Sequence, residues 1–88
     1  DYYKSLNYLS ISIEKLLANE NYYISDFKGL DRVLLSDLYK FRASIYSKIN
    51  VPKLMCEDYH LALSLITDSE VDQEKVKKLI SENCELIQ

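Results

Sequence analysis

Apolar residues in the first part of the chain recur at the spacing of an α-helix. Between residues 2 and 16 they are four and three positions apart in turn, as Tyr2, Leu6, Leu9, Ile13 and Leu16. This spacing puts them on one stripe of a helix, and Asp1 before it is a favoured N-cap residue. Apolar and polar residues also alternate over 9–13, as in a strand, but no other segment offers a partner strand. We therefore predict a helix over 2–19.

The longest periodic pattern follows between residues 27 and 49. Apolar residues there are three or four positions apart, as Phe27, Leu30, Leu34, Leu38, Phe41, Ile45 and Ile49. A flanking stripe contains Leu35, Tyr39 and Tyr46. We predict a helix over 26–50 and expect both stripes to pack against neighbouring helices. Gly29 inside the pattern costs about 1 kcal/mol relative to Ala, so the alternative is a short extra turn at 25–29 before the main helix.

A break with a clear physical cause precedes the third helix. Asn50 and Val51 lead into Pro52. Proline disfavours helical backbone in the residue before it, but it fits the first turn of a helix. The third helix is therefore predicted over 52–66. One face of it holds Met55, Tyr59, Ala62 and Ile66.

A fourth helix follows the polar segment 67–70. Asp72 is its predicted N-cap, and Val71 and Val76 on either side of this residue are expected to form a hydrophobic staple. The helix is predicted over 72–87. Four helices joined by short loops predict a single all-α domain, folded as a compact antiparallel four-helix bundle around one core.

Composition supports a folded domain of modest size. The 88 residues are 48 % hydrophobic, which is too apolar for a disordered chain. Unbroken aliphatic runs reach three residues, far fewer than the roughly 20 that cross a bilayer, so we expect no membrane association. The first residue is Asp1 rather than Met, and we expect the sequence to be a domain excised from a longer chain.

The charge of the chain argues against nucleic acid as a partner. Fourteen acids and eleven bases give a net charge of −3, and the excess of acids lies in residues 45–88. Binding to a phosphate backbone requires clustered Lys and Arg. The acidic balance instead favours a protein partner with a basic surface. The excess of Lys over Arg, together with frequent Ile and Tyr, indicates a low-GC genome.

Three residues come nearest to a metal site. Cys56 and His60 are four positions apart on the third predicted helix and would project side by side, with Cys84 as a third ligand. Two fixed ligands are a weak pattern, so we expect no metal and no other cofactor. We expect Cys56 to be a small buried side chain, both thiols to be reduced and the location to be cytoplasmic. The single glycine excludes a Gly-rich phosphate loop, and we predict no enzymatic activity.

Tyrosines concentrate near the start of the chain. Five of the eight lie in the first 23 residues. Tyrosine combines a large rigid apolar area with a polar tip, and binding energy often concentrates on it. On the first helix, Tyr8 and Ile11 lie opposite the main apolar stripe and leave a second apolar face there. The predicted partner-binding residues are Tyr3, Tyr8, Ile11, Tyr22 and Tyr23.

These features predict a non-enzymatic protein–protein interaction module. We expect it to present the Tyr-rich surface, together with the acidic C-terminal half, to a protein partner. One alternative is an inhibitor of immunity or antitoxin type that masks a basic toxin, which the size and charge also suit. Another is a homo-oligomeric structural domain of a larger protein, in which the first helix forms a homodimer through its apolar stripe. A small metal-binding domain is the minor alternative.

Overall fold

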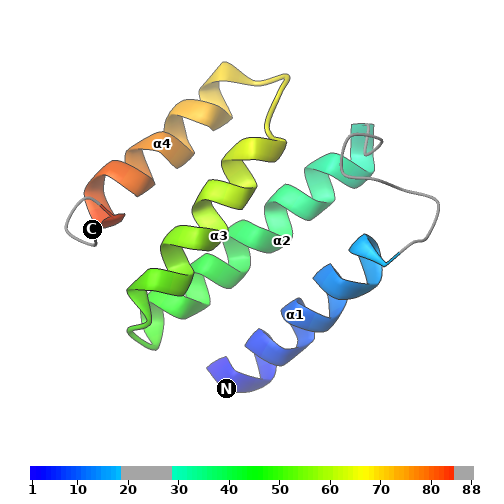
Figure 1. Ribbon diagram of the computed structural model, residues 1–88, viewed down its shortest axis with the longest axis vertical. Helices are drawn as coiled ribbons and strands as arrows, with labels where there is room; N and C mark the ends of the chain where they lie inside the picture. Colours follow the sequence, from blue (N-terminus) through cyan, green and yellow to red (C-terminus); the bar gives the residue numbers. More distant parts are fainter. Residues whose placement is uncertain (19–28, 85–88) are drawn as a thin grey trace.

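All regular secondary structure in the part of the chain that the structure describes is helical. The computed structural model describes residues 1–18 and 29–84, and side chains within 1–18 and 32–84. Its helices are α1 (Tyr2–Leu17), α2 (Gly29–Lys48), α3 (Pro52–Leu65) and α4 (Glu70–Cys84) (Figure 1). The described residues contain no strand, so the all-α prediction is confirmed. The alternative short turn at 25–29 lies, apart from Gly29, outside the described residues.

The first helix begins where the sequence predicts. The Asp1 carboxylate accepts hydrogen bonds from the backbone N–H groups of Tyr3 and Lys4, at 2.9 and 3.4 Å. These groups have no partner within the helix, so the cap stabilises α1 by about 1 kcal/mol. The predicted stripe is buried or half-buried at Leu6, Leu9, Ile13 and Leu16. Tyr2 at its start is instead 47 % exposed.

The turn between α2 and α3 combines a left-handed residue with proline. Asn50 has a φ of 60°, in a backbone region that Asn tolerates better than most residues. The Val51 N–H donates to the Tyr46 carbonyl at 2.9 Å, and the Asn50 N–H donates to the Ser47 carbonyl at 3.2 Å. These paired bonds satisfy two of the last carbonyls of α2. Pro52 then begins α3 as predicted, because its missing N–H would have no helical partner there.

The start of α4 differs from the prediction. The helix begins at Glu70, and the Ser69 hydroxyl caps it by accepting a hydrogen bond from the Asp72 N–H at 3.2 Å. Asp72 therefore lies in the first turn, where a carboxylate interacts favourably with the helix dipole. The predicted staple is wrong as well, since Val71 is 65 % exposed while Val76 is buried. Serine caps a helix as well as aspartate does, so treating Ser69 as part of a polar loop caused the error.

The second and third helices form a central antiparallel pair. The Ser36 hydroxyl donates to the Ala62 carbonyl at 3.2 Å, and Arg42 bonds to Asp58 further along. Positions rise along α2 as they fall along α3, so the two helices run in opposite directions. Figure 1 shows α1 and α4 on opposite sides of this pair, where α1 packs mainly on α2 and α4 on α3.

The buried apolar residues fall into two clusters. The α1-side cluster contains Ile13, Leu35, Tyr39, Ala62 and Leu65. The α4-side cluster contains Ala43, Met55, Cys56, Tyr59 and Val76. The central pair contributes to both clusters, whereas α1 and α4 each contribute to one. The helices therefore form a compact all-helical globule with two adjoining clusters, and the predicted antiparallel bundle around one core is not confirmed.

The second helix does not bury the stripe that its periodicity emphasises. Leu35 and Tyr39, on the flanking stripe, are buried. Leu34 and Phe41, on the main stripe, are 48 % and 59 % exposed. Because α1 and α3 contact α2 from other sides, no described helix covers these two residues. The expectation that both stripes pack against neighbours is therefore wrong at Leu34 and Phe41.

Candidate functional site

A largely buried ion pair joins α2 to α3. The Arg42 guanidinium donates two hydrogen bonds to the Asp58 carboxylate, at 2.7 and 2.8 Å. The two side chains are 18 % and 3 % exposed. Another guanidinium N–H of Arg42 donates to the Ser10 hydroxyl of α1 at 3.3 Å. The guanidinium carbon also lies 5.5 and 5.9 Å from the ring centroids of Tyr39 and Tyr46. One arginine thus links three helices.

The geometry of this site is that of a structural ion pair. The hydrogen bond to Asp58 raises the pKa of Arg42, so the guanidinium keeps its charge. Both carboxylate oxygens of Asp58 accept from the same arginine, which occupies them within the protein. The composition of the chain does not show that Arg42 and Asp58 are buried. The signal in the sequence is positional, because Asp58 lies one helical turn from both Met55 and Ala62, on the buried face of α3.

A shallow, mainly apolar groove runs between α1 and α2 on the outside of the molecule. Its lining residues are Tyr8, Ser12, Lys15, Leu16, Leu34 and Leu38. Phe41 is seven residues after Leu34, two turns along the same side of α2, and extends the apolar area. Ile11, one turn from Tyr8 and 42 % exposed, extends it around α1. We refer to Tyr8, Ile11, Leu34 and Phe41 as the α1–α2 surface.

The structure separates residues that the sequence groups as one binding surface. Tyr3 and Tyr8 are 69 % and 71 % exposed. Because they are five residues apart on α1, their side chains are rotated by about 140° relative to each other, and Tyr3 does not line the groove. Ile11 stays with Tyr8. Tyr22 and Tyr23 lie outside the described residues. The sequence puts the other two residues of the surface, Leu34 and Phe41, on a stripe that its periodicity predicts to be packed. Periodicity alone does not show which stripe of a helix its neighbours cover.

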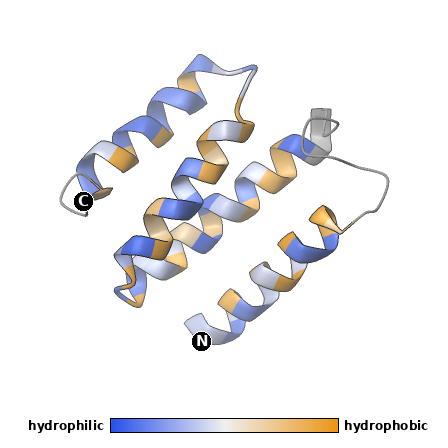
Figure 2. Ribbon diagram, viewed as in Figure 1, coloured by the Kyte–Doolittle hydropathy of each residue, from blue (hydrophilic) through white to orange (hydrophobic). Residues whose placement is uncertain are grey.

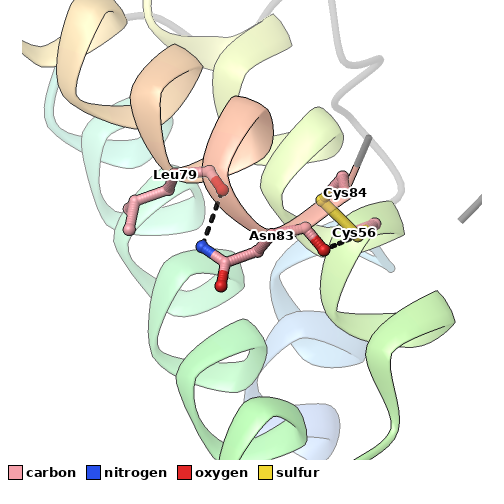
Figure 3. Close-up of a disulfide and its surroundings, with 4 residues drawn as sticks. All are labelled: Cys56, Leu79, Asn83 and Cys84. Carbon is pink, nitrogen blue, oxygen red and sulfur yellow. Dashed lines mark hydrogen bonds between the residues drawn. A yellow bond between two sulfur atoms is a disulfide. The ribbon is translucent and has the colours of Figure 1, made fainter. Parts of the chain in front are cut away.

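Cys56 and Cys84 form a disulfide, so the prediction of reduced thiols is wrong (Figure 3). Their Cα atoms are 5.8 Å apart, within the range usual for disulfides. The bond joins α3 to the last residue of α4. Close to it, the Asn83 side chain donates to the Leu79 carbonyl at 2.8 Å. The two cysteines are 28 positions apart in sequence, and they meet because α4 folds back along α3.

The disulfide changes the candidate metal set of Cys56, His60 and Cys84. Cysteine binds metals as the thiolate, and sulfurs joined in a disulfide are not thiolates. His60 is exposed and lines a shallow hollow beside the disulfide. Of the three residues in the set, it is the one whose side chain can still bind a metal. Across residues 1–18 and 29–84, no group of three or more His, Cys, Asp or Glu could hold a metal ion. The disulfide form therefore lacks the ligands of the metal-binding alternative.

Comparison with known proteins does not assign a family. No protein-family model matches the chain, and no curated protein or solved structure matches it either. In the part of the chain that the structure describes, every helix is too short or too polar to span a membrane. We therefore infer the function from the side chains that the fold exposes, above all those of the α1–α2 surface.

Proposed function

We propose that this chain is a non-enzymatic protein-interaction module that binds a protein partner through the α1–α2 surface. The uneven distribution of exposed apolar side chains carries the proposal. Among the described residues, seven of the ten exposed large apolar side chains lie on α1 and α2, and the α1–α2 surface contains four of these seven. Exposed apolar side chains that gather on one part of a protein are typical of interaction sites.

The residue types and the support of the surface fit this role. Tyr8 and Phe41 supply two aromatic side chains, which often carry much of the binding energy of an interface. Leu16 and Leu38, which also line the groove, pack against the α1-side cluster. Arg42 of α2 donates a hydrogen bond to Ser10 of α1 and so joins the two walls of the groove. A surface that is ordered before binding loses less conformational entropy on binding.

The alternative of an inhibitor that masks a basic toxin has a different surface in its favour. Exposed acids gather before and in the first turns of α4, at Asp68, Glu70, Asp72 and Glu74. Part of this negative charge is offset, because the Lys77 ammonium lies 3.5 Å from the Glu74 carboxylate. An acidic interface would not need the α1–α2 surface. The two functions therefore predict opposite results for the same set of variants.

The disulfide indicates the kind of compartment in which the chain would bind its partner. Disulfides persist in oxidising compartments and are rare in the cytosol. The prediction of a cytoplasmic location depends in part on reduced thiols, and Cys56 and Cys84 are not reduced. We therefore include in this proposal that the module meets its partner in an oxidising compartment.

Site-specific cross-linking identifies the partner and the surface together. A photoreactive phenylalanine analogue at Tyr8 or at Phe41 is expected to cross-link one protein in an extract of the source. The same analogue at Leu61 is expected not to cross-link that protein. Leu61 is a suitable control because it is 42 % exposed and lies on α3, away from the groove. The cross-linked protein is then purified for binding measurements.

Alanine variants measured against the purified partner decide the proposal. Tyr8→Ala and Leu34→Ala are each expected to weaken binding by about tenfold or more, as residues central to an interface do. Leu61→Ala is expected to change it by less than about twofold, and circular dichroism checks that all variants remain folded. If Glu70→Lys and Glu74→Lys weaken binding while Leu34→Ala does not, the acidic surface is the site and the proposal is wrong.

A further inference from the structure

The α1–α2 surface has a lysine at each end of its α1 side. Lys15 lines the groove with Tyr8, and Lys4 lies one turn before Tyr8 on the same side of the helix. Both lysines are exposed, and neither forms an ion pair with another described residue. On α2, Asp37 pairs with Lys40 at 3.1 Å, so this acid is already compensated. The N-cap Asp1 also lies on this side of α1, whereas Glu14 is rotated by about 120° from Tyr8. The groove side of α1 therefore has two lysines and one acid, and it is locally positive although the chain as a whole carries a net charge of −3.

We infer that the groove binds an amphipathic helix of a protein partner, with acidic residues flanking its apolar stripe. This inference rests on the proposed function and specifies its partner. A groove between two helices accepts a third helix whose apolar residues recur every three or four positions. Lys4 and Lys15, which pair with no acid among the described residues, complement Asp or Glu beside that stripe. Salt screens charges beyond roughly 8–10 Å, so these local lysines outweigh the net charge that favours a basic partner.

A second copy of this chain fits the same groove poorly. In a symmetric contact of two α1 helices centred between Tyr8 and Ile11, each Lys4 would meet Lys15 of the second copy, because the helices run in opposite directions. Like charges in contact oppose such a dimer. The α4 helix of a second copy would offer a mostly charged face, with Val71 as its exposed large apolar side chain.

Model peptides test the inference with the full chain. Three fluorescein-labelled helical peptides are compared: a leucine stripe flanked by Glu, the same stripe flanked by Lys, and an alanine stripe flanked by Glu. Anisotropy titrations are expected to give a Kd at least about tenfold lower for the first peptide than for the other two. The double variant Lys4→Glu/Lys15→Glu is expected to reverse the preference between the Glu- and Lys-flanked peptides. Lys77→Glu/Lys78→Glu on α4 is the matched control and is expected to leave the preference unchanged.

The outcomes separate this inference from the proposed function. Equal Kd values for the Glu- and Lys-flanked peptides, or an unchanged preference after charge reversal at Lys4 and Lys15, overturn the inference. If Leu34→Ala still weakens binding of the purified natural partner, the proposed function survives that result. If Leu34→Ala weakens neither partner nor peptide binding, both are wrong. A wild-type dimer in sedimentation equilibrium that Tyr8→Ala converts to monomer would assign the groove to a second copy, and would also overturn the inference.

Discussion

The first and last helices dock on opposite sides of the same central pair, but different interactions hold them. Each has one buried side chain, Ile13 in α1 and Val76 in α4. The disulfide between Cys56 and Cys84 ties α4 to α3, and Figure 2 shows that α4 is largely hydrophilic. In the described part of the chain, α1 has no covalent bond to its neighbours beyond the backbone. It carries instead half of the α1–α2 surface.

The two helices show two ways in which a helix with few buried side chains can be held on the rest of the protein. A polar helix gains little from apolar burial, and a disulfide stabilises it mainly by restricting the unfolded chain. An apolar helix is held by packing and has apolar area left over on its outer side. That remaining area is what recognition of a partner requires. On the proposed function, α4 therefore contributes to stability and α1 to binding.

Breaking the ion pair between Arg42 and Asp58 in the central helices is expected to have the largest effect on stability. Asp58→Ala leaves Arg42 charged in a site where its side chain is 18 % exposed. Removing one partner of such a pair is expected to lower the free energy of unfolding by about 3–5 kcal/mol, measured by urea denaturation. Lys77→Ala, which removes an exposed contact with Glu74, is the control and should cost less than about 1 kcal/mol. A loss for Asp58→Ala no larger than the control's would contradict the structural role of the pair.

Removing the disulfide is expected to release α4 while leaving α1 in place. Cross-linking residues 28 positions apart lowers the entropy of the unfolded chain, which is worth about 3–4 kcal/mol. Cys56→Ala/Cys84→Ala should lose that much unfolding free energy and show faster amide hydrogen exchange along α4. Mass spectrometry after alkylation of the untreated protein checks the starting point, since both cysteines should remain unlabelled. Equally fast exchange in α1 would show that the two helices are not held independently.

A smaller and more local effect is expected from the α1-side cluster. Ile13→Val removes one methylene from the buried side chain of α1 and should cost about 0.5–1.5 kcal/mol. Because packing rather than a disulfide holds α1, hydrogen exchange should become faster in α1 than in α4. Val76→Ala is the counterpart in α4. While the disulfide is intact, it should change amide hydrogen exchange in α4 less than Ile13→Val changes it in α1. Faster exchange in α4 than in α1 after Ile13→Val would reverse the comparison.

The smallest effect concerns alkaline pH, because each cluster contains one buried tyrosine. Burial raises the pKa of Tyr39 and of Tyr59 above the ordinary value of 10.0. The folded chain then keeps a phenol proton that the unfolded chain loses, so stability is complete below about pH 10 and falls as pH rises further. Tyr39→Phe and Tyr59→Phe should each flatten the fall in unfolding free energy between about pH 9 and about pH 11. If both variants lose stability as steeply as the wild type, burial of these phenols does not control the alkaline limit.

Local signals allowed much of the helix layout to be predicted from the sequence. Asp1 caps α1 and Pro52 begins α3 as predicted, because caps and proline act on the backbone within a few residues. The exposure of Tyr8 and Ile11 also follows from helical periodicity, since they lie opposite the packed stripe of α1. The start of α4 was missed although Ser69 carries an equally local signal, so that error lies in the interpretation rather than in missing information.

By itself, the sequence determined that the chain forms helices, that Asp1 caps α1 and Pro52 begins α3, and which face of α1 stays outside. These properties depend on residues within one or two helical turns of each other. Only the tertiary structure decided which stripe of α2 is covered, that Asp58 is buried beside Arg42, and that Cys56 meets Cys84. Such contacts join residues far apart in the chain, and the packing of all the helices together selects them.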